Sequence, residues 1–202
     1  MKYLLLFIVF LISFNSFSQE KGFSGGIFAG GVTSQVDGDT YGGYNKFGVD
    51  FGVFTRFNFN KEWFGTFEIS FINKGSKYKN AQAYGCYTLI VNYIEMPIYA
   101  TFKPKHIKNI TQLSFDIGLA PAVLINAKED TKCLKPVEPK YYNVRRFDIS
   151  TVVGVNWHFT EKFRVGVRFL YTIIPIKDNE PFNLYKSGSY NNVLVLNLFY
   201  TI

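Results

Sequence analysis

The sequence predicts an all-β fold: an eight-stranded antiparallel up-and-down transmembrane β-barrel whose polar lumen is filled by side chains. Three observations predict it: segments that alternate apolar and polar residues, segments longer than ordinary globular strands, and connections that alternate between short and long. The composition agrees, because Phe, Tyr and Trp make up 19% of the 202 residues. Aromatic chains with strand periodicity are typical of sandwiches and barrels.

The first 18 residues have the organisation of a secretory signal peptide, and residues 19–202 then form one barrel domain. Lys2 precedes an apolar segment, and Ser16 and Ser18 stand at positions −3 and −1 of a cleavage site before Gln19. A membrane anchor helix is the alternative, but the apolar segment of about eleven residues is too short to span a bilayer. The sequence therefore predicts export.

Eight segments of this domain alternate with a period of two, which indicates strands with two unlike faces. They are residues 22–33, 47–59, 62–74, 88–102, 111–126, 144–159, 162–175 and 190–202. Globular strands are usually about 5–6 residues long, whereas a tilted membrane strand needs about 9–11 residues for the hydrocarbon alone. Pro97 and Pro121 lie inside two segments, and we expect a bulge or a local break there because proline cannot donate to the strand ladder.

The connections between these segments alternate in length. Short links occur at Asn60-Lys61, from Pro104 to Asn109, and at Thr160-Glu161, whereas the links at 34–46, 75–87, 127–143 and 176–189 are longer. Outer-membrane barrels have short periplasmic turns, long extracellular loops and an even number of strands. This pattern predicts an outer-membrane, multi-pass barrel with both termini in the periplasm.

One parity of the strands is apolar, and the other carries five acidic and five basic residues among small polar ones. The charged residues are Asp50, Arg56, Glu68, Lys74, Glu95, Asp116, Arg146, Asp148, Arg164 and Arg168. A balanced set of charges favours a closed lumen, where each buried charge needs a partner. Asp50 and Arg56 lie roughly 20 Å apart along one strand, so we expect each to pair with a neighbouring strand.

Aromatic residues gather beside the short connections, and the sequence predicts that they form a periplasmic girdle at the headgroup level. The predicted girdle contains Phe57, Phe59, Trp63, Phe102, Trp157, Phe159 and Phe163. The alternative is that aromatic side chains simply suit strands, but this does not explain why both tryptophans lie next to short turns.

Three runs of the sequence resemble the PorT-like outer-membrane β-barrel proteins of the Bacteroidetes. They are GGIFAGGVTSQVDGDTYGGYNKFGVDFGVF (25–54), FEISFINKGSKY (67–78) and NYIEMPIYATFK (92–103). The resemblance extends from about residue 22 to the C-terminus and implies an eight-stranded outer-membrane barrel assembled by the barrel-insertion machinery. The namesake of the family takes part in type IX secretion and gliding. The chain resembles the general domain pattern more than this namesake, so the secretion role is not carried over.

Cys86 and Cys133 are the only cysteines, and they fall in the second and third long connections. An even pair in an exported protein favours a disulfide between neighbouring loops. Two free thiols are the alternative, and metal binding by one cysteine pair without a nearby histidine is disfavoured.

The sequence predicts no catalytic, cofactor-binding or metal site, and no GxSxG motif occurs. Of the two histidines, His106 lies in a short connection, and His158 shares a face with Asp148 and Ser150 at roughly 27–33 Å along the strand. These groups are too far apart to form a triad. The Asp37-Gly38-Asp39 turn lacks the other ligands of a calcium loop.

The third long connection is a candidate partner-binding loop, since Tyr and Arg are enriched at binding hot spots. Its residues of interest are Pro136, Pro139, Tyr141, Tyr142 and Arg145; a merely solvated loop is the alternative. The leading prediction is a non-enzymatic barrel that contacts outer-membrane lipid and a protein partner in an envelope or secretion complex. A narrow pore for small solutes and a soluble, secreted, lipocalin-like binding barrel remain alternatives. The scattered basic residues, with a net charge of +7, form no stripe for nucleic acid.

Overall fold

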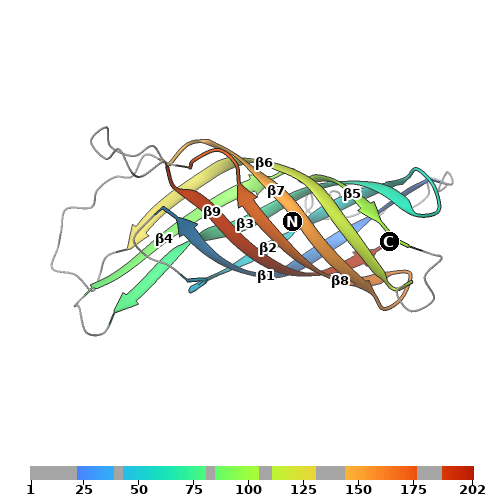
Figure 1. Cartoon of the computed structure of the whole chain (residues 1–202), viewed down its shortest axis with the longest axis horizontal. Helices are drawn as coiled ribbons and strands as arrows, with labels where there is room; N and C mark the ends of the chain where they lie inside the picture. Colours follow the sequence, from blue (N-terminus) through green and yellow to red (C-terminus); the bar gives the residue numbers. More distant parts are fainter. Residues whose placement is uncertain (1–21, 39–42, 81–84, 105–110, 131–143, 177–187) are drawn as a thin grey trace, which may run out of the picture.

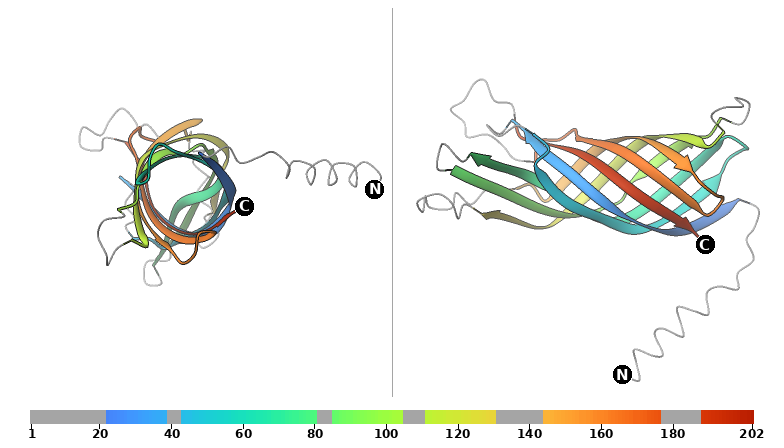
Figure 2. Two further views of the ribbon diagram at one scale, coloured as in Figure 1. Left: turned by 90° about the vertical axis from the view of Figure 1, so that its right-hand side faces the viewer. Right: turned by 90° about the horizontal axis from the view of Figure 1, so that it is seen from below.

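Nine antiparallel strands form a closed barrel in the computed structural model, which describes residues 22–38, 43–80, 85–104, 111–130, 144–176 and 188–202. They are β1 (Phe23–Asp37), β2 (Lys46–Asn58), β3 (Trp63–Asn80), β4 (Gly85–Glu95), β5 (Ile98–Phe102), β6 (Leu113–Asp130), β7 (Phe147–His158), β8 (Phe163–Thr172) and β9 (Tyr190–Thr201) (Figure 1). β4 and β5 occupy successive parts of one position between β3 and β6, so the wall has eight strand positions. β9 pairs with β1, and the view along the axis shows the closed ring (Figure 2). The predicted eight-stranded barrel is confirmed.

The interruption between β4 and β5 comes at Met96 and Pro97, where a local break was expected. The register with β3 continues across it, and the carbonyl of Pro97 accepts a hydrogen bond from the amide of Glu68 at 2.9 Å. The corresponding expectation for Pro121 is wrong, because β6 runs through this residue without a break. The carbonyl of Pro121 accepts from the amide of Met96 at 2.8 Å, so its missing N–H faces the interruption and not the continuous ladder with β7. A register shift against β6 occurs instead beside Asn92.

The tilt of the strands follows from the register around the barrel. The pairings lead from Gly25 on β1 through every wall position and back to Gln35 on β1, a shear of ten residues (35 − 25). With eight strands about 4.8 Å apart and a rise of about 3.3 Å per residue, this shear gives a tilt of about 40°. The value lies within the range of membrane barrels.

The two ends of the barrel differ in their connections. At one end, here called the short-turn end, the amide of Phe59 donates to the carbonyl of Trp63 at 3.1 Å and the amide of Phe159 to the carbonyl of Phe163 at 3.0 Å. The last residue, Ile202, is also at this end, because its amide donates to the carbonyl of Gly25 at 2.9 Å. The strand ends that the longer connections join are at the opposite end, here called the long-loop end, where β3, β4 and β6 reach far out (Figure 1).

The polar parity faces inward and the apolar parity faces outward. In β2, Phe47, Val49 and Phe51 are exposed whereas Asp50 and Phe54 are buried. This is the reverse of a soluble barrel, whose large apolar side chains fill the interior. Among the described residues, no helix combines the length and the hydropathy needed to span a membrane.

Candidate functional site: the lumen and the outer wall

The barrel interior holds nine of the ten charged residues expected there. Eight are buried: Asp50, Glu68, Lys74, Glu95, Asp116, Asp148, Arg164 and Arg168. The ninth, Arg56, is partly exposed, although its Nε and Nη2 atoms are buried. Strand alternation explains these positions, since each residue shares its parity with buried neighbours on the same strand.

Arg146 is the exception, and its assignment to the lumen is wrong. It is exposed and precedes the first residue of β7, and its carbonyl accepts a hydrogen bond from the amide of Leu124 at 2.8 Å. Conversely, Lys46 is buried at the long-loop end of β2, where its ammonium donates to the carbonyl of Phe47 at 2.6 Å and to the side chain of Asn73. The alternation of β2 could have identified Lys46, because it shares the parity of Asp50.

An ion pair crosses the middle of the lumen. Arg168 on β8 donates to both carboxylate oxygens of Glu68 on β3, at 2.7 and 2.8 Å. The hydroxyl of Tyr99 donates to Glu68 and accepts from Arg168. Since β3 and β8 are four positions apart in a ring of eight, the two side chains meet from opposite walls. Bidentate arginine–carboxylate pairs are among the strongest protein hydrogen bonds.

Asp116 extends this group, which we call the inner network (Glu68, Tyr99, Arg168 and Asp116). One oxygen of Asp116 lies 3.7 Å from Nη2 of Arg168. Its carboxylate also accepts from Thr101 at 2.7 Å and from Asn156 at 2.8 Å. The buried carboxylate is therefore fully surrounded by donors, which offsets its loss of hydration.

A second group, the outer network (Lys74, Glu95 and Asp148), lies nearer the long-loop end. The ammonium of Lys74 donates to Glu95 and lies 4.0 Å from an oxygen of Asp148. Thr172 and Asn191 each donate to the same Asp148 oxygen at 3.2 Å. One lysine is thus shared by two carboxylates, and the neutral donors contact only Oδ2 of Asp148, whereas its buried Oδ1 has no hydrogen-bond partner among the described residues.

Two arginines at the short-turn end have a different environment. Arg164 is 2% exposed, and none of its three side-chain nitrogens has a hydrogen-bond acceptor among the described residues. Its guanidinium carbon lies 3.9 Å from the ring centre of Phe199 and 5.0 Å from that of Phe54. Arg56 lies over the ring of Phe64 at 5.4 Å. Aromatic faces therefore contact these cations where carboxylates do not.

His158 does not form a catalytic triad with the groups considered above. Its Nε2 lies 3.0 Å from the hydroxyl oxygen of Ser114, a contact that sequence reasoning missed and that only the β6–β7 register reveals. Ser114 is fully buried. Asp116, the nearby carboxylate, is bonded to Thr101 and Asn156 instead. Within the described ranges, no three acidic, histidine or cysteine residues are grouped as metal ligands.

The predicted girdle residues all lie at the short-turn end. Six of the seven are exposed, and Phe102 is partly buried beneath Trp63, with the two ring centres 4.9 Å apart. Phe57 similarly contacts Phe59 at 5.2 Å and Phe23 at 4.8 Å. The predicted girdle residues, here called the aromatic surface, therefore lie at one end of the wall, and several of them contact one another in small groups.

A polar belt lies on the outside of β3, β4 and β6 toward the long-loop end. Asn73 donates to Asn92 and Asn92 donates to Asn126, which forms a ladder across β3, β4 and β6. Ten residue steps separate Trp63 from Asn73 on β3 (73 − 63), which at a tilt of about 40° correspond to a height of about 25 Å. This is the height of the apolar band of outer-membrane barrels, about 25 Å. β3 continues for seven more residues, to Asn80, beyond the belt.

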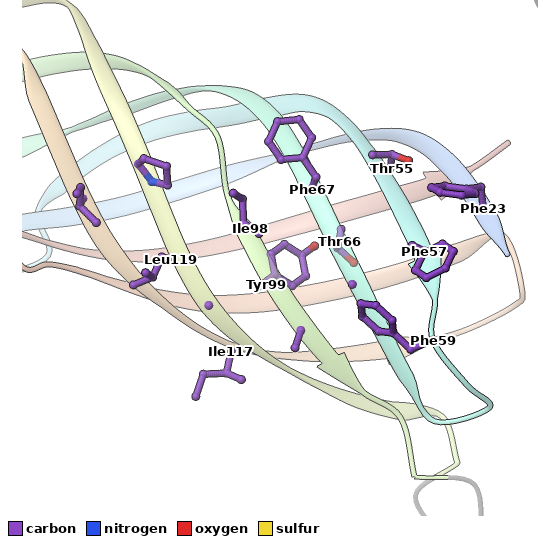
Figure 3. A pocket seen from close by; sticks show the side chains of 15 residues that line it. Phe23, Thr55, Phe57, Phe59, Thr66, Phe67, Ile98, Tyr99, Ile117 and Leu119 are labelled. Carbon is purple, nitrogen blue, oxygen red and sulfur yellow. The ribbon is translucent and has the colours of Figure 1, made fainter.

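The outer wall also contains an apolar hollow near the short-turn end, with a volume of about 780 Å³. Figure 3 shows Phe57, Phe59 and Phe67 on one side of it and Ile98, Ile117 and Leu119 on the other. Its lining is almost entirely apolar. The sequence alone did not reveal this hollow, because the hollow depends on which short side chains the strand register places next to each other.

Several predicted residues are not placed by the structure. The signal peptide, His106, Asp39, Cys133, Pro136, Pro139, Tyr141 and Tyr142 lie outside the described residues. Cys86 belongs to β4, but its proposed disulfide partner is not described, so the bridge remains a prediction. Arg145 is exposed next to β7, and its amide donates to the carbonyl of Ile176 at 2.7 Å.

Comparison with known proteins gives one family and several distant structural likenesses. The model of a family described as outer membrane protein beta-barrel domain matches residues 17–178. Ail, the attachment invasion locus protein of Yersinia pestis, is 13% identical, with a TM-score of 0.49 and coverage of 90% of this chain and 99% of Ail. Neisserial surface protein A is 9% identical, with a TM-score of 0.49 and coverages of 90% and 98%.

OprG from Pseudomonas aeruginosa is 11% identical, with a TM-score of 0.42 and coverages of 89% and 94%. Likenesses of this size carry no argument about what the chain does. A search of the curated proteins finds no match.

Proposed function

The chain belongs to the outer membrane protein beta-barrel domain family, and from this membership we propose that it is a non-enzymatic, non-conducting barrel that binds a partner through its surface at the long-loop end. The observation that carries the proposal is the interior, which side chains fill at two successive levels: the inner network joins opposite walls, and the outer network joins β3, β4 and β7. With the interior filled, the outer surface and the loops are the parts of the barrel that can contact a partner.

The inner network supports a closed lumen most directly. Glu68 and Arg168 meet from opposite walls, and both are at most 3% exposed. Opening a path through this level requires breaking a buried bidentate ion pair, which costs about 3–5 kcal/mol if one partner is left uncompensated. Eight-stranded barrels are in general just wide enough for side chains to fill.

The long-loop end supports a surface role. β3 and β6 are 18 residues long and continue past the asparagine ladder. Exposed basic residues, including Lys77, Lys128, Arg145 and Arg146, lie near these extensions. In this proposal the long-loop end is extracellular, both termini are periplasmic, and the third long connection, with Tyr141 and Tyr142, takes part in partner binding. PorT-like membership and an origin in the Bacteroidetes belong to the same proposal.

Conductance and co-purification test the proposal. In planar bilayers the purified barrel is expected to give no steady single-channel steps, whereas reproducible steps would favour a narrow solute pore. A mild-detergent pull-down from native outer membranes is expected to recover a protein partner. The double variant Tyr141→Ala/Tyr142→Ala should lose that partner, and Tyr200→Ala, at the short-turn end, should retain it.

Two results would contradict the proposal. Equal recovery of the partner with both variants would show that the third connection is not the binding surface. Recovery of the chain from the soluble periplasm, without the heat-modifiable gel mobility typical of membrane barrels, would favour a lipocalin-like soluble barrel.

A further inference from the structure

The apolar hollow in the outer wall arises from a particular order of side-chain sizes. Along one row of the sheet, Phe57 on β2 faces Gly65 on β3, Gly65 faces Ala100 on β5, and Ala100 faces Ile117 on β6. Two short side chains therefore lie between two long ones. The row above contains Phe67, Ile98 and Leu119, which close the hollow on the side of the membrane centre (Figure 3).

Phe59 closes the hollow on the side of the short turns. A Cβ atom on Gly65 would lie 2.9 Å from the ring of Phe59, so this ring folds back over the glycine. Trp63 and Phe102 are the next outward pair toward the turns. The hollow therefore lies just inside the aromatic surface, at the depth where acyl chains begin if this surface lies at the headgroup level.

The chemistry of the lining limits what can bind. Its almost complete lack of polar atoms excludes a ligand that must satisfy hydrogen bonds there. The volume of about 780 Å³ lies within the usual range for small-molecule sites, about 300–1,000 Å³. At the short-turn side, the adjacent β2–β3 turn carries the exposed Lys61, a suitable partner for an anionic phosphate.

We propose that this hollow binds one acyl chain of a phospholipid from the leaflet at the short-turn end, with the lipid phosphate near Lys61. A flexible chain can follow the irregular floor formed by Gly65 and Ala100. A second copy of the chain cannot fill the hollow through a two-fold interface centred here, because the hollows of the two copies would then face each other. The inference concerns the wall and is independent of partner binding at the long-loop end.

Lipid retention and acyl-chain photocrosslinking test the inference. The barrel is reconstituted into nanodiscs of phosphatidylethanolamine and phosphatidylglycerol that carry a diazirine in one acyl chain. Cross-linked peptides are mapped, and retained lipid is counted by native mass spectrometry after detergent extraction. The filling variant is Ala100→Leu, and the matched control is Ala29→Leu, which also faces outward but lies on β1 between Phe51 and Leu198.

The wild type and Ala29→Leu are expected to retain one phospholipid and to cross-link mainly at β3, β5 and β6. Ala100→Leu should reduce both signals about tenfold while keeping heat-modifiable gel mobility. Even labelling around the wall, equal retention by the two leucine variants, or a cross-linked dimer of the chain would overturn the inference. If Ala100→Leu does not fold, Lys61→Gln decides: selective loss of retained phosphatidylglycerol supports the inference, and unchanged retention refutes it.

Discussion

Removal of Glu68 is the most direct test of the inner network. In Glu68→Leu the side chain keeps a similar volume, but Arg168 loses both of its hydrogen bonds to a carboxylate, at 2.7 and 2.8 Å. The guanidinium then keeps its hydrogen bond to the neutral hydroxyl of Tyr99, and the carboxylate that remains near it, that of Asp116, lies farther away, at 3.7 Å. A buried charge left in this way destabilises a protein by about 3–5 kcal/mol, and we expect the free energy of unfolding to fall by that amount.

Arg56→Met is the matched control, because it also removes an inward-facing charge. Nε and Nη2 of Arg56 have no acceptor among the described residues. Its contact with the ring of Phe64, at 5.4 Å, is worth about 0.5–1 kcal/mol, and removing a poorly solvated cation offsets this loss. The free energy of unfolding should therefore change by no more than about 1 kcal/mol in either direction.

The assay is urea unfolding in phospholipid vesicles, followed by tryptophan fluorescence and by gel mobility of unheated samples. The double variant Glu68→Leu/Arg168→Met should be less destabilised than Glu68→Leu alone, since it leaves no unpaired cation. If Glu68→Leu and Arg56→Met lower stability equally, the lumen charges act without specific partners and the argument from the ion pair is wrong.

Three further predictions concern other parts of the barrel. Gly75 has a φ of +139°, and a Cβ added to it would lie 2.0 Å from a backbone carbonyl oxygen. Gly75→Ala should therefore lower the free energy of unfolding by about 1–3 kcal/mol. Gly31→Ala is the control, because nothing lies within 4 Å of its added Cβ, and an equal loss of stability in the two variants would refute the prediction. Lys74→Met should destabilise the barrel by about 3–5 kcal/mol in the same urea assay, because it leaves two buried carboxylates of the outer network without a cation; an unchanged midpoint would contradict the network. Cys86 and Cys133 should form a disulfide, so that the unreduced protein has a mass about 2 Da below the reduced form, whereas identical masses would establish free thiols.

Strand parity was enough to predict which way most side chains face. With a period of two, either the even-numbered or the odd-numbered residues of a strand face inward. Once Asp50 and Glu68 face inward, the other residues of the same parity on their strands face inward too. Parity predicts the direction of a side chain only where the apolar and polar residues of a strand alternate. Arg146, one residue before β7, was therefore assigned to the wrong surface, and the extension of β3 from the predicted residue 74 to Asn80 was missed.

Partners across the lumen were beyond prediction from the sequence. Glu68 and Arg168 are 100 residues apart, and they meet because the shear of ten residues brings their levels together from opposite walls. The shear is the sum of all the registers around the barrel, so an error of one residue in any turn would pair different side chains. Asp50, expected to pair with a neighbouring strand, accepts a hydrogen bond at 2.6 Å from Asn197 on β9, which lies beyond the neighbouring β1.

The charge balance of the lumen also has a different physical basis from the one expected. Six of the nine predicted charges that face inward belong to the two networks, but Arg56 and Arg164 have no salt bridge among the described residues. Arg164 instead lies against Phe54 and Phe199, two phenylalanines that occupy inward-facing positions. A guanidinium is more weakly hydrated than an ammonium and stacks well on aromatic rings. Arginine, but not lysine, can therefore be buried at this end, so Arg164→Lys should destabilise the barrel although it conserves the charge.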